Sequence, residues 1–289
     1  MQYNSLSELI EKCHSSRLPL WQVICADSAH EDSLSFDDEF VKMGKMWETM
    51  LSCTENYDAS LMSSSRLSGG DGGRMESFMA KETTVCGSFI DSVITTALKM
   101  GESNACMKRI VAAPTAGSCG VLPSVLVSSY KAGIGSAQTI TQSLFVSAAI
   151  GGVIAQRASI AGAQGGCQAE IGAASAMAAG ALVHIHSGST EQIMYAASMA
   201  LQNLLGLTCD PVAGLVEIPC VKRNVIGAVN ACSCADMALA GITTKIPPDQ
   251  VIDAMKSIGD KMDISLKETG LGGLAATDEG LRLAKLPSM

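Results

Sequence analysis

Residues 171–183 read IGAASAMAAGALV, and residues 144–155 read LFVSAAIGGVIA. Neither segment contains a charged side chain, yet both are shorter than the roughly 20 apolar residues that an α-helix needs to cross a bilayer. We therefore expect two buried helices of a globular core. Small residues recur in both at spacings of three and four, which places them on one face of a helix. Such flat faces predict that neighbouring helix axes lie unusually close together.

The rest of the sequence also favours helices. The middle of the chain is dominated by Ala, Gly, Ser, Ile, Val and Met, aromatic residues make up 4% of the chain, and alternation of apolar and polar residues is scarce. The best candidate for a strand, residues 212–221, is interrupted by Pro219. Later helices are expected at 224–240 and 248–262, the second with proline in its first turn. The pattern predicts an all-α fold, a single compact helical domain over residues 1–289.

The part before the core falls into two sections. Residues 1–62 carry both tryptophans and much mixed charge, and they predict a peripheral helical part that begins with a helix over residues 1–11. Residues 63–74 read SSSRLSGGDGGR, with four glycines in five positions. No regular element is expected there, so the segment predicts a loop whose backbone can approach a ligand closely. A helix over residues 78–100 should follow.

The composition limits the classes of partner. Hydrophobic residues make up 47% of the chain and charged residues 17%, below the roughly 25% of an ordinary soluble domain, which indicates a large apolar interior or a covered face. A net charge of −8 gives no overall attraction to nucleic acid or anionic membranes, so neither is expected as a partner. The N-terminus lacks the pattern of a secretory signal, and we expect a cytoplasmic protein. The eleven cysteines, an odd number, are then not expected to form a disulfide framework.

Several common functional motifs are missing. The sequence has no GxxxxGKS or GxxxxGKT phosphate loop, no HExxH motif, no GxSxG elbow and no Rossmann glycine signature after a convincing strand. His184 and His186 lie two residues apart, as do Cys232 and Cys234. On a helix the two members of such a pair face different directions, so neither pair is expected to chelate one ion.

Three other cysteines are flanked by glycine or proline. Cys167 lies in GGCQAE, Cys209 in CDPVAG and Cys220 in PCVKRN. We expect each at a helix end or in a loop, where thiolates from separate elements can converge on one metal cluster. Lys222 and Arg223 could offset the negative charge collected there. Their spacings of 42 and 11 residues match no local ferredoxin signature, so on spacing alone simple core packing remains an alternative.

These cysteine segments belong to a longer series of motifs, which runs in order along most of the chain. With it, the sequence resembles the α chain of the iron–sulfur L-serine dehydratases. The other matching segments are SGGD at 68–71, ESNA at 102–105, VAAPTAGSCG at 111–120, KETG at 267–270 and GGLA at 272–275.

The resemblance implies an all-helical catalytic domain and a cofactor. It makes Cys167, Cys209 and Cys220 the three ligands of a [4Fe-4S] cluster. Three thiolates for four irons leave one iron with an open position, which can act as a Lewis acid on the hydroxyl and carboxylate of L-serine. The expected reaction is elimination of water, giving pyruvate and ammonia without pyridoxal phosphate.

The resemblance also assigns the general base to another polypeptide. In the family the base is a histidine supplied by a β domain, whereas none of the four histidines here falls in a family motif. We therefore assign no base to this chain. We expect a separate L-serine dehydratase β chain as the partner in a heteromer, and this chain to be inactive alone.

Substrate binding is expected mainly at the glycine-rich segment. Ser65, Ser68 and the backbone of Gly69 and Gly70 would meet the carboxylate or amine of serine, while Asp71 orients the loop. Further pocket donors would be Asn104, Thr115 and Ser118. Cys119 is expected beside the site without binding iron. Without the resemblance, an ordinary flexible loop would be the simpler interpretation of this segment.

Three features depart from the family pattern. Arg66 and Lys108 stand where glycine is expected, and residues 286–289 read LPSM, without the terminal cysteine that some relatives use as a fourth cluster ligand. A large cation at position 66 either alters substrate access or points outward. Capping of the cluster by the chain's own C-terminus is not expected.

Three other functions compete with this reading. A pyridoxal-phosphate dehydratase would need a Schiff-base lysine and a parallel sheet, and neither is indicated. An L-cysteine desulfidase would use the same cluster on another substrate. A structural zinc module would need four closed ligands, whereas three strong cysteine motifs are present.

Overall fold

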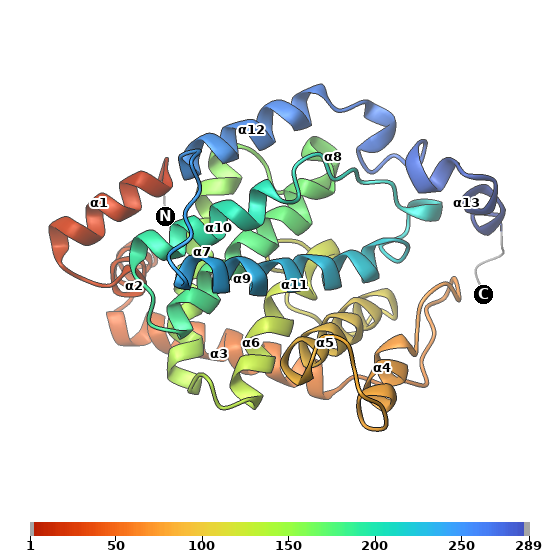
Figure 1. Cartoon of the computed structure of the whole chain (residues 1–289), viewed down its shortest axis with the longest axis horizontal. Coiled ribbons are helices and arrows are strands. Elements are labelled where there is room, and N and C mark those ends of the chain that lie inside the picture. Colours follow the sequence, from red (N-terminus) through yellow and green to blue (C-terminus); the bar gives the residue numbers. More distant parts are fainter. Residues whose placement is uncertain (1–2, 286–289) are drawn as a thin grey trace.

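The computed structural model describes residues 3–285 and confirms an all-α fold, because no strand occurs among these residues. The only extended pairing within this range is an isolated parallel bridge between Cys209 and Lys267. Figure 1 shows the helices gathered around one centre. The α-helices are α1 Leu6–Ser16, α2 Leu20–Glu31, α3 Phe36–Glu55, α4 Asp71–Met79, α5 Ser88–Ala105, α6 Val121–Lys131, α7 Ala137–Arg157, α8 Gly162–Gly165, α9 Ala173–Ile185, α10 Thr190–Gln202, α11 Cys220–Leu239, α12 Pro248–Lys261 and α13 Asp278–Leu283. The shorter helices are η1 Ala116–Ser118, η2 Gln168–Gly172, η3 Val212–Gly214, η4 Ile264–Leu266 and η5 Gly273–Ala276.

Helix α9 is the centre of the core. Every residue of α9 except His184 is buried, and the helix packs against α6, α7, α10 and α11. A Cβ atom added to Gly180 of α9 would lie 2.3 Å from Cδ1 of Ile150 in α7, and one added to Gly151 of α7 would lie 2.8 Å from the sulfur of Met177. The small residues therefore let the two apolar helices approach closely, as their spacing predicts.

Helix α7 has the length and apolar composition of a membrane span, the one such helix in the described part of the chain. However, 67% of the most apolar 18-residue stretch of α7 is buried inside the protein. That burial is typical of a core helix in a globular fold.

The N-terminal helices form an outer layer on the same core. Helices α2 and α3 pack against α7, and α2 buries Ile24 completely. Trp47 of α3 is 3% exposed and makes an edge contact with Tyr130 of α6. The first helix begins at Leu6, after Ser5 as its N-cap, rather than at residue 1.

Three expected boundaries are wrong. The glycine-rich loop ends at Gly70, because α4 begins at Asp71, and residues 80–87 separate α4 from α5 where one helix over 78–100 was expected. The strand candidate at 212–221 is instead the 3₁₀ turn η3 followed by the start of α11 at Cys220. Pro219 accounts for the error over the strand candidate, because proline favours the beginning of a helix over the interior of a strand.

The close contact between α7 and α9 gives a test of the core. Replacing Gly180 with alanine should lower the free energy of unfolding by about 1–3 kcal/mol, because its methyl group would displace the fully buried Ile150. The matched control is Gly152→Ala in α7, where an added Cβ meets nothing within 4 Å; removing a helical glycine there should stabilise by about 0.5–1 kcal/mol. Urea unfolding followed by circular dichroism measures both, and equal stability of the two variants would contradict the close packing.

Candidate functional site

The three motif cysteines begin or flank elements at one end of the helical core. Cys167 comes directly before η2, a π-helical turn that continues into α9. Cys209 lies in the connection between α10 and η3, held by hydrogen bonds from its own N–H to the Leu266 carbonyl and from the Glu268 N–H to its carbonyl. Cys220 is the first residue of α11. As expected, none of the three lies in the interior of an α-helix.

The three thiols lie near one another. Cys167 and Cys209 are 3% and 4% exposed and share a hydrogen bond, which lowers the pKa of Cys167 and, together with burial, raises that of Cys209. Burial raises the pKa of the half-buried Cys220 to about 12, and the negative charges of Cys167 and Glu170 contribute. Thiols from three separate elements, here called the cysteine cluster, therefore lie near one another.

Arg223 supplies positive charge to this cluster. Its guanidinium donates a hydrogen bond of 2.7 Å to the Thr208 carbonyl and lies 2.8 Å from Oδ1 of Asp210, an ion pair in which Asp210 is buried and Arg223 partly buried. Its charge also helps to lower the pKa of Cys167 and opposes the rise at Cys220. Lys222 instead reaches Asp71, at 3.0 Å.

Thiols are the ligands that iron–sulfur clusters take in proteins, so the donor chemistry of Cys167, Cys209 and Cys220 fits such a group. Among residues 3–285, no three His, Cys, Asp or Glu side chains are arranged to hold one metal ion. Space beside Cys209 also depends on glycine, since a Cβ at Gly162 would lie 3.0 Å from the sulfur of Cys209.

Glu170 is a site residue to which the sequence analysis gave no role. Its carboxylate accepts a 2.6 Å hydrogen bond from Thr115 and lies 4.0 Å from the sulfur of Cys209. Burial, and to a lesser degree the charge of Glu268, raises the pKa of Glu170. Ser118 forms a capping box with Thr115, so both proposed pocket donors lie beside Glu170. The sequence feature that could have identified Glu170 is its place in the GGCQAE motif, three residues after Cys167.

The glycine-rich loop, residues 63–70, is tightly folded. Gly69 has a φ of 143°, and a Cβ there would lie 2.3 Å from the Leu61 carbonyl oxygen, so only glycine fits. Ser68 is 9% exposed. The hydroxyl of Ser65 donates to the carboxylate of Glu217, at 2.8 and 2.9 Å from its two oxygens. The loop is therefore anchored by a residue far away in sequence.

A second buried carboxylate holds the start of α4. Glu102 is 1% exposed and accepts hydrogen bonds from the backbone N–H groups of Asp71 and Gly72 and from the hydroxyl of Tyr57. These bonds satisfy donors that a helix N-terminus otherwise leaves free. Asn104, two residues further along α5, donates to the Ala116 carbonyl in η1. The ESNA motif, residues 102–105, thus contacts both the start of α4, through Glu102, and η1, through Asn104.

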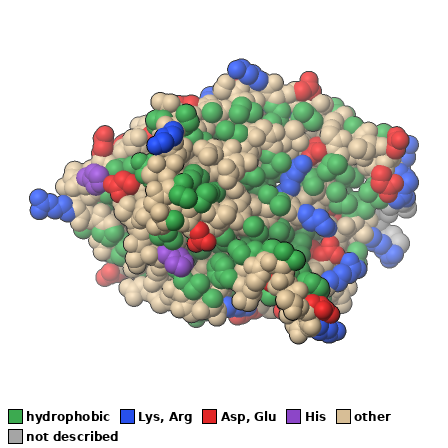
Figure 2. All heavy atoms as spheres, viewed as in Figure 1, with side chains coloured by type: hydrophobic (Ala, Val, Ile, Leu, Met, Phe, Trp, Pro, Cys, Tyr) green, Lys and Arg blue, Asp and Glu red, His purple; other side chains and the backbone are tan. Residues whose placement is uncertain are grey.

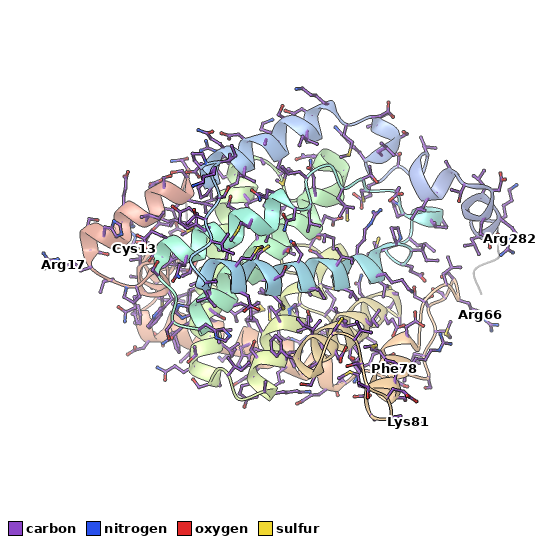
Figure 3. The ribbon with its side chains drawn as sticks, in the orientation of Figure 1. Cys13, Arg17, Arg66, Phe78, Lys81 and Arg282 are labelled. Carbon is purple, nitrogen blue, oxygen red and sulfur yellow. The ribbon has the colours of Figure 1, made fainter. Side chains whose placement is uncertain are left out.

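The two departures from the family pattern point into solvent. Arg66 is exposed, has a φ of 63°, and projects away from the body of the protein (Figure 3). Lys108 is also exposed. The predicted absence of a C-terminal ligand falls on residues 286–289, which lie outside the described residues.

The histidines take no part in this site. His14 pairs with Glu191, and His30 and His186 are exposed near the ends of α2 and α9. His184 is mostly buried, its Nε2 has no hydrogen-bond partner, and burial lowers its pKa. The histidine side chains visible in Figure 2 lie toward the end that carries α1, away from the start of α11.

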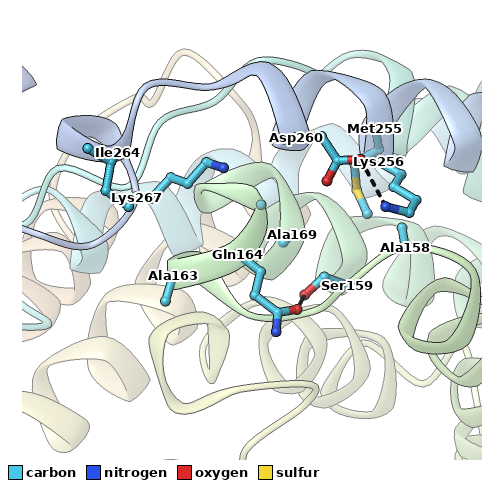
Figure 4. Close-up of a pocket in the computed structure, with 12 residues that line it drawn as sticks. Ala158, Ser159, Ala163, Gln164, Ala169, Met255, Lys256, Asp260, Ile264 and Lys267 are labelled. Carbon is cyan, nitrogen blue, oxygen red and sulfur yellow. Dashed lines mark hydrogen bonds and ion pairs between the residues drawn. The ribbon is translucent and has the colours of Figure 1, made fainter.

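A pocket of about 280 Å³ lies between the α8 segment and helix α12 (Figure 4). Gly165 and Ala169, on either side of Cys167, form part of its wall, and Met255, Asp260 and Lys267 close it from the other side. None of the predicted site residues lines it. This pocket therefore gives no support for a substrate site of its own.

Comparison with known proteins agrees with the family that the sequence motifs resemble. The serine dehydratase alpha chain family matches residues 15–275. The chain is 42% identical to a probable L-serine dehydratase alpha chain of Bacillus subtilis, over 98% of this chain and 94% of that protein. It is 38% identical to the L-serine dehydratase alpha chain of Peptoniphilus asaccharolyticus, over 98% and 97%. The L-serine dehydratase of Helicobacter pylori is 37% identical over 95% of this chain, which covers only 62% of that longer protein. This chain belongs to the serine dehydratase alpha chain family.

The ion pair between Lys222 and Asp71 gives a pH-dependent prediction. Burial alone would raise the pKa of Asp71, but Lys222 and Arg74 lower it overall. A lowered carboxyl pKa adds stability above the ordinary pKa of about 4, and that stability is lost as the pH falls through the folded-state value. Lys222→Gln should therefore cost about 0.2–1 kcal/mol at neutral pH, because the lysine is exposed, and the difference should shrink in acid.

Urea unfolding at a series of pH values measures this difference. Lys45→Gln, at an exposed position of α3, is the matched loss of a positive charge. A difference for Lys222→Gln that stayed constant down to low pH would contradict the pairing with Asp71.

Proposed function

We propose that this chain is the α subunit of an L-serine dehydratase, which eliminates water from L-serine to give pyruvate and ammonia. Membership of the family supports the reaction class. The observation that supports the proposal is that Cys167, Cys209 and Cys220, from three motifs, lie near one another, with Cys167 and Cys209 buried.

Those three thiolates would hold a [4Fe-4S] cluster. When bound, such a cluster supplies a Lewis-acid position that favours departure of the serine hydroxyl. Arg223 offsets the negative charge of the thiolates from within the protein, in the manner of groups just outside a metal's ligand shell. Glu170 and Thr115 lie beside Cys209 and orient the polar wall of the site.

The glycine-rich loop would bind the substrate. Ser68, Gly69 and Gly70 precede the N-terminus of α4, where Asp71 and Glu102 fix the backbone. A backbone without side chains lets a small amino acid approach closely. In this proposal the loop orients the carboxylate or amine of serine while a base removes the α proton.

A separate β chain would supply that base, in the cytoplasm. No histidine of this chain lies in the site, and the Helicobacter pylori relative is a longer polypeptide that this chain matches over 62%. The side chains of Leu215 and Leu274 near the site, and of Leu271, which is 71% exposed, offer apolar surface for a partner. Figure 2 shows hydrophobic side chains mixed with charged ones at this end of the protein.

Anaerobic purification with and without a β chain tests the proposal. The pair should contain iron and sulfide and form pyruvate from L-serine faster than from L-cysteine, whereas the chain alone should be inactive. Cys209→Ser should lose most of the iron, sulfide and turnover, because a serine oxygen is a poor ligand for this cluster.

The matched control is Cys232→Ser, which alters a buried thiol of α11 outside the cluster and should keep its iron. Full iron content and full turnover in Cys209→Ser would contradict the ligand assignment. Faster release of pyruvate from L-cysteine would contradict the assignment of serine as substrate.

A further inference from the structure

The carboxylate of Glu217 is the point at which two distant parts of the site meet. Its Oε2 accepts a 2.7 Å hydrogen bond from the hydroxyl of Ser63, and both of its oxygens accept from the hydroxyl of Ser65. The two serine oxygens also lie 3.0 Å apart. One carboxylate thus gathers the first part of the glycine-rich loop, more than 150 residues away in sequence.

The burial of Glu217 makes these hydrogen bonds important. Its side chain is 6% exposed, and no Lys, Arg or His among the described residues forms an ion pair with it. A buried carboxylate is costly unless donors satisfy it. The hydroxyls of Ser63 and Ser65 are the side-chain donors that do so here.

The same residues continue into the loop and into α11. The N–H of Ser63 donates to the Ser68 carbonyl, and the hydroxyls of Ser63 and Ser65 accept from the N–H groups of Ser68 and Leu67. On the other side, the carbonyl of Glu217 accepts from the N–H of Val221, the residue after Cys220. The contacts therefore form a continuous path between the loop and the first turn of α11.

We propose that Glu217 is a positioning residue that latches the glycine-rich loop to the start of the helix carrying Cys220. This inference rests on the proposed function, because the loop is the proposed binding element for serine. It assigns the hydroxyl of Ser65 to the latch and leaves Ser68, Gly69 and Gly70 to meet the substrate. The latch fixes the distance between the element that binds substrate and a ligand of the metal cluster.

Limited proteolysis tests the latch without relying on activity. Arg66 is exposed within the loop, so trypsin can cut after it once the surrounding backbone opens (Figure 3). In Glu217→Gln the new amide nitrogen cannot accept a hydrogen bond from a serine hydroxyl. Trypsin should therefore cleave after Arg66 about tenfold faster, while the cleavage rates at other sites stay unchanged. Ser63→Ala should give a change in the same direction and decides the matter if Glu217→Gln fails to fold. Glu48→Gln, at an exposed position of α3, should cut like the unaltered chain.

Steady-state kinetics of the complex with the β chain separate positioning from simple stability. Glu217→Gln should raise the KM for L-serine about tenfold and leave kcat within about twofold of its original value, with unchanged iron and sulfide. A role in stability alone would lower kcat through loss of folded protein and leave KM unchanged. A lower kcat with unchanged KM overturns the inference. Equal rates of cleavage after Arg66 in Glu217→Gln and in the unaltered chain overturn it as well. Absence of turnover in the unaltered complex would instead refute the proposed function and leave the proteolysis result to decide the latch.

Discussion

The close approach of helices through small residues is the constraint on which the site depends. Gly227 of α11 is so near the end of η2 that an added Cβ would lie 2.8 Å from Ile171. Likewise, a Cβ added to Gly101 of α5 would lie 3.2 Å from the Cα of Val221, at the start of α11. Because η2 follows Cys167 and α11 begins with Cys220, these contacts fix the positions of two of the three thiols. The cysteines therefore belong to the rigid core, although two of them begin helices and one lies in a loop.

Three glutamate carboxylates and the Arg223 guanidinium lie near the cysteines and the glycine-rich loop. The buried carboxylates of Glu102 and Glu217 lie beside the loop, and the partly buried carboxylate of Glu170 lies beside Cys209. Arg223 is the partly buried cation that balances them on the cysteine side. Glu102 and Glu217 are stabilised instead by backbone N–H groups and hydroxyls, so their role is to organise the polypeptide around the site. Each of these two carboxylates depends on a small set of hydrogen bonds. Loss of the bonds to Glu102 would free the start of α4, and loss of those to Glu217 would free the glycine-rich loop.

Much of the fold was predictable from the sequence because its signals are local. Apolar runs with small residues predict buried helices, and Pro248 in the first turn of α12 is where the sequence indicates. The positions of Cys167, Cys209 and Cys220 at helix ends or in a loop follow from neighbouring glycine and proline. The break at residues 80–87 was missed, and so was the helical start at Cys220, although Pro219 is a local signal for it. Glu170 and Glu217 were missed because their partners Thr115 and Ser63 lie 55 and 154 residues away.

Locating iron in crystals of the anaerobically prepared protein would test the central claim most directly. Anomalous diffraction at the iron absorption edge identifies iron independently of the fold. The account predicts one compact group of iron atoms bound by the sulfur atoms of Cys167, Cys209 and Cys220, with no fourth cysteine of this chain as a ligand. Iron bound elsewhere, or bound without one of these three sulfur atoms, would contradict it.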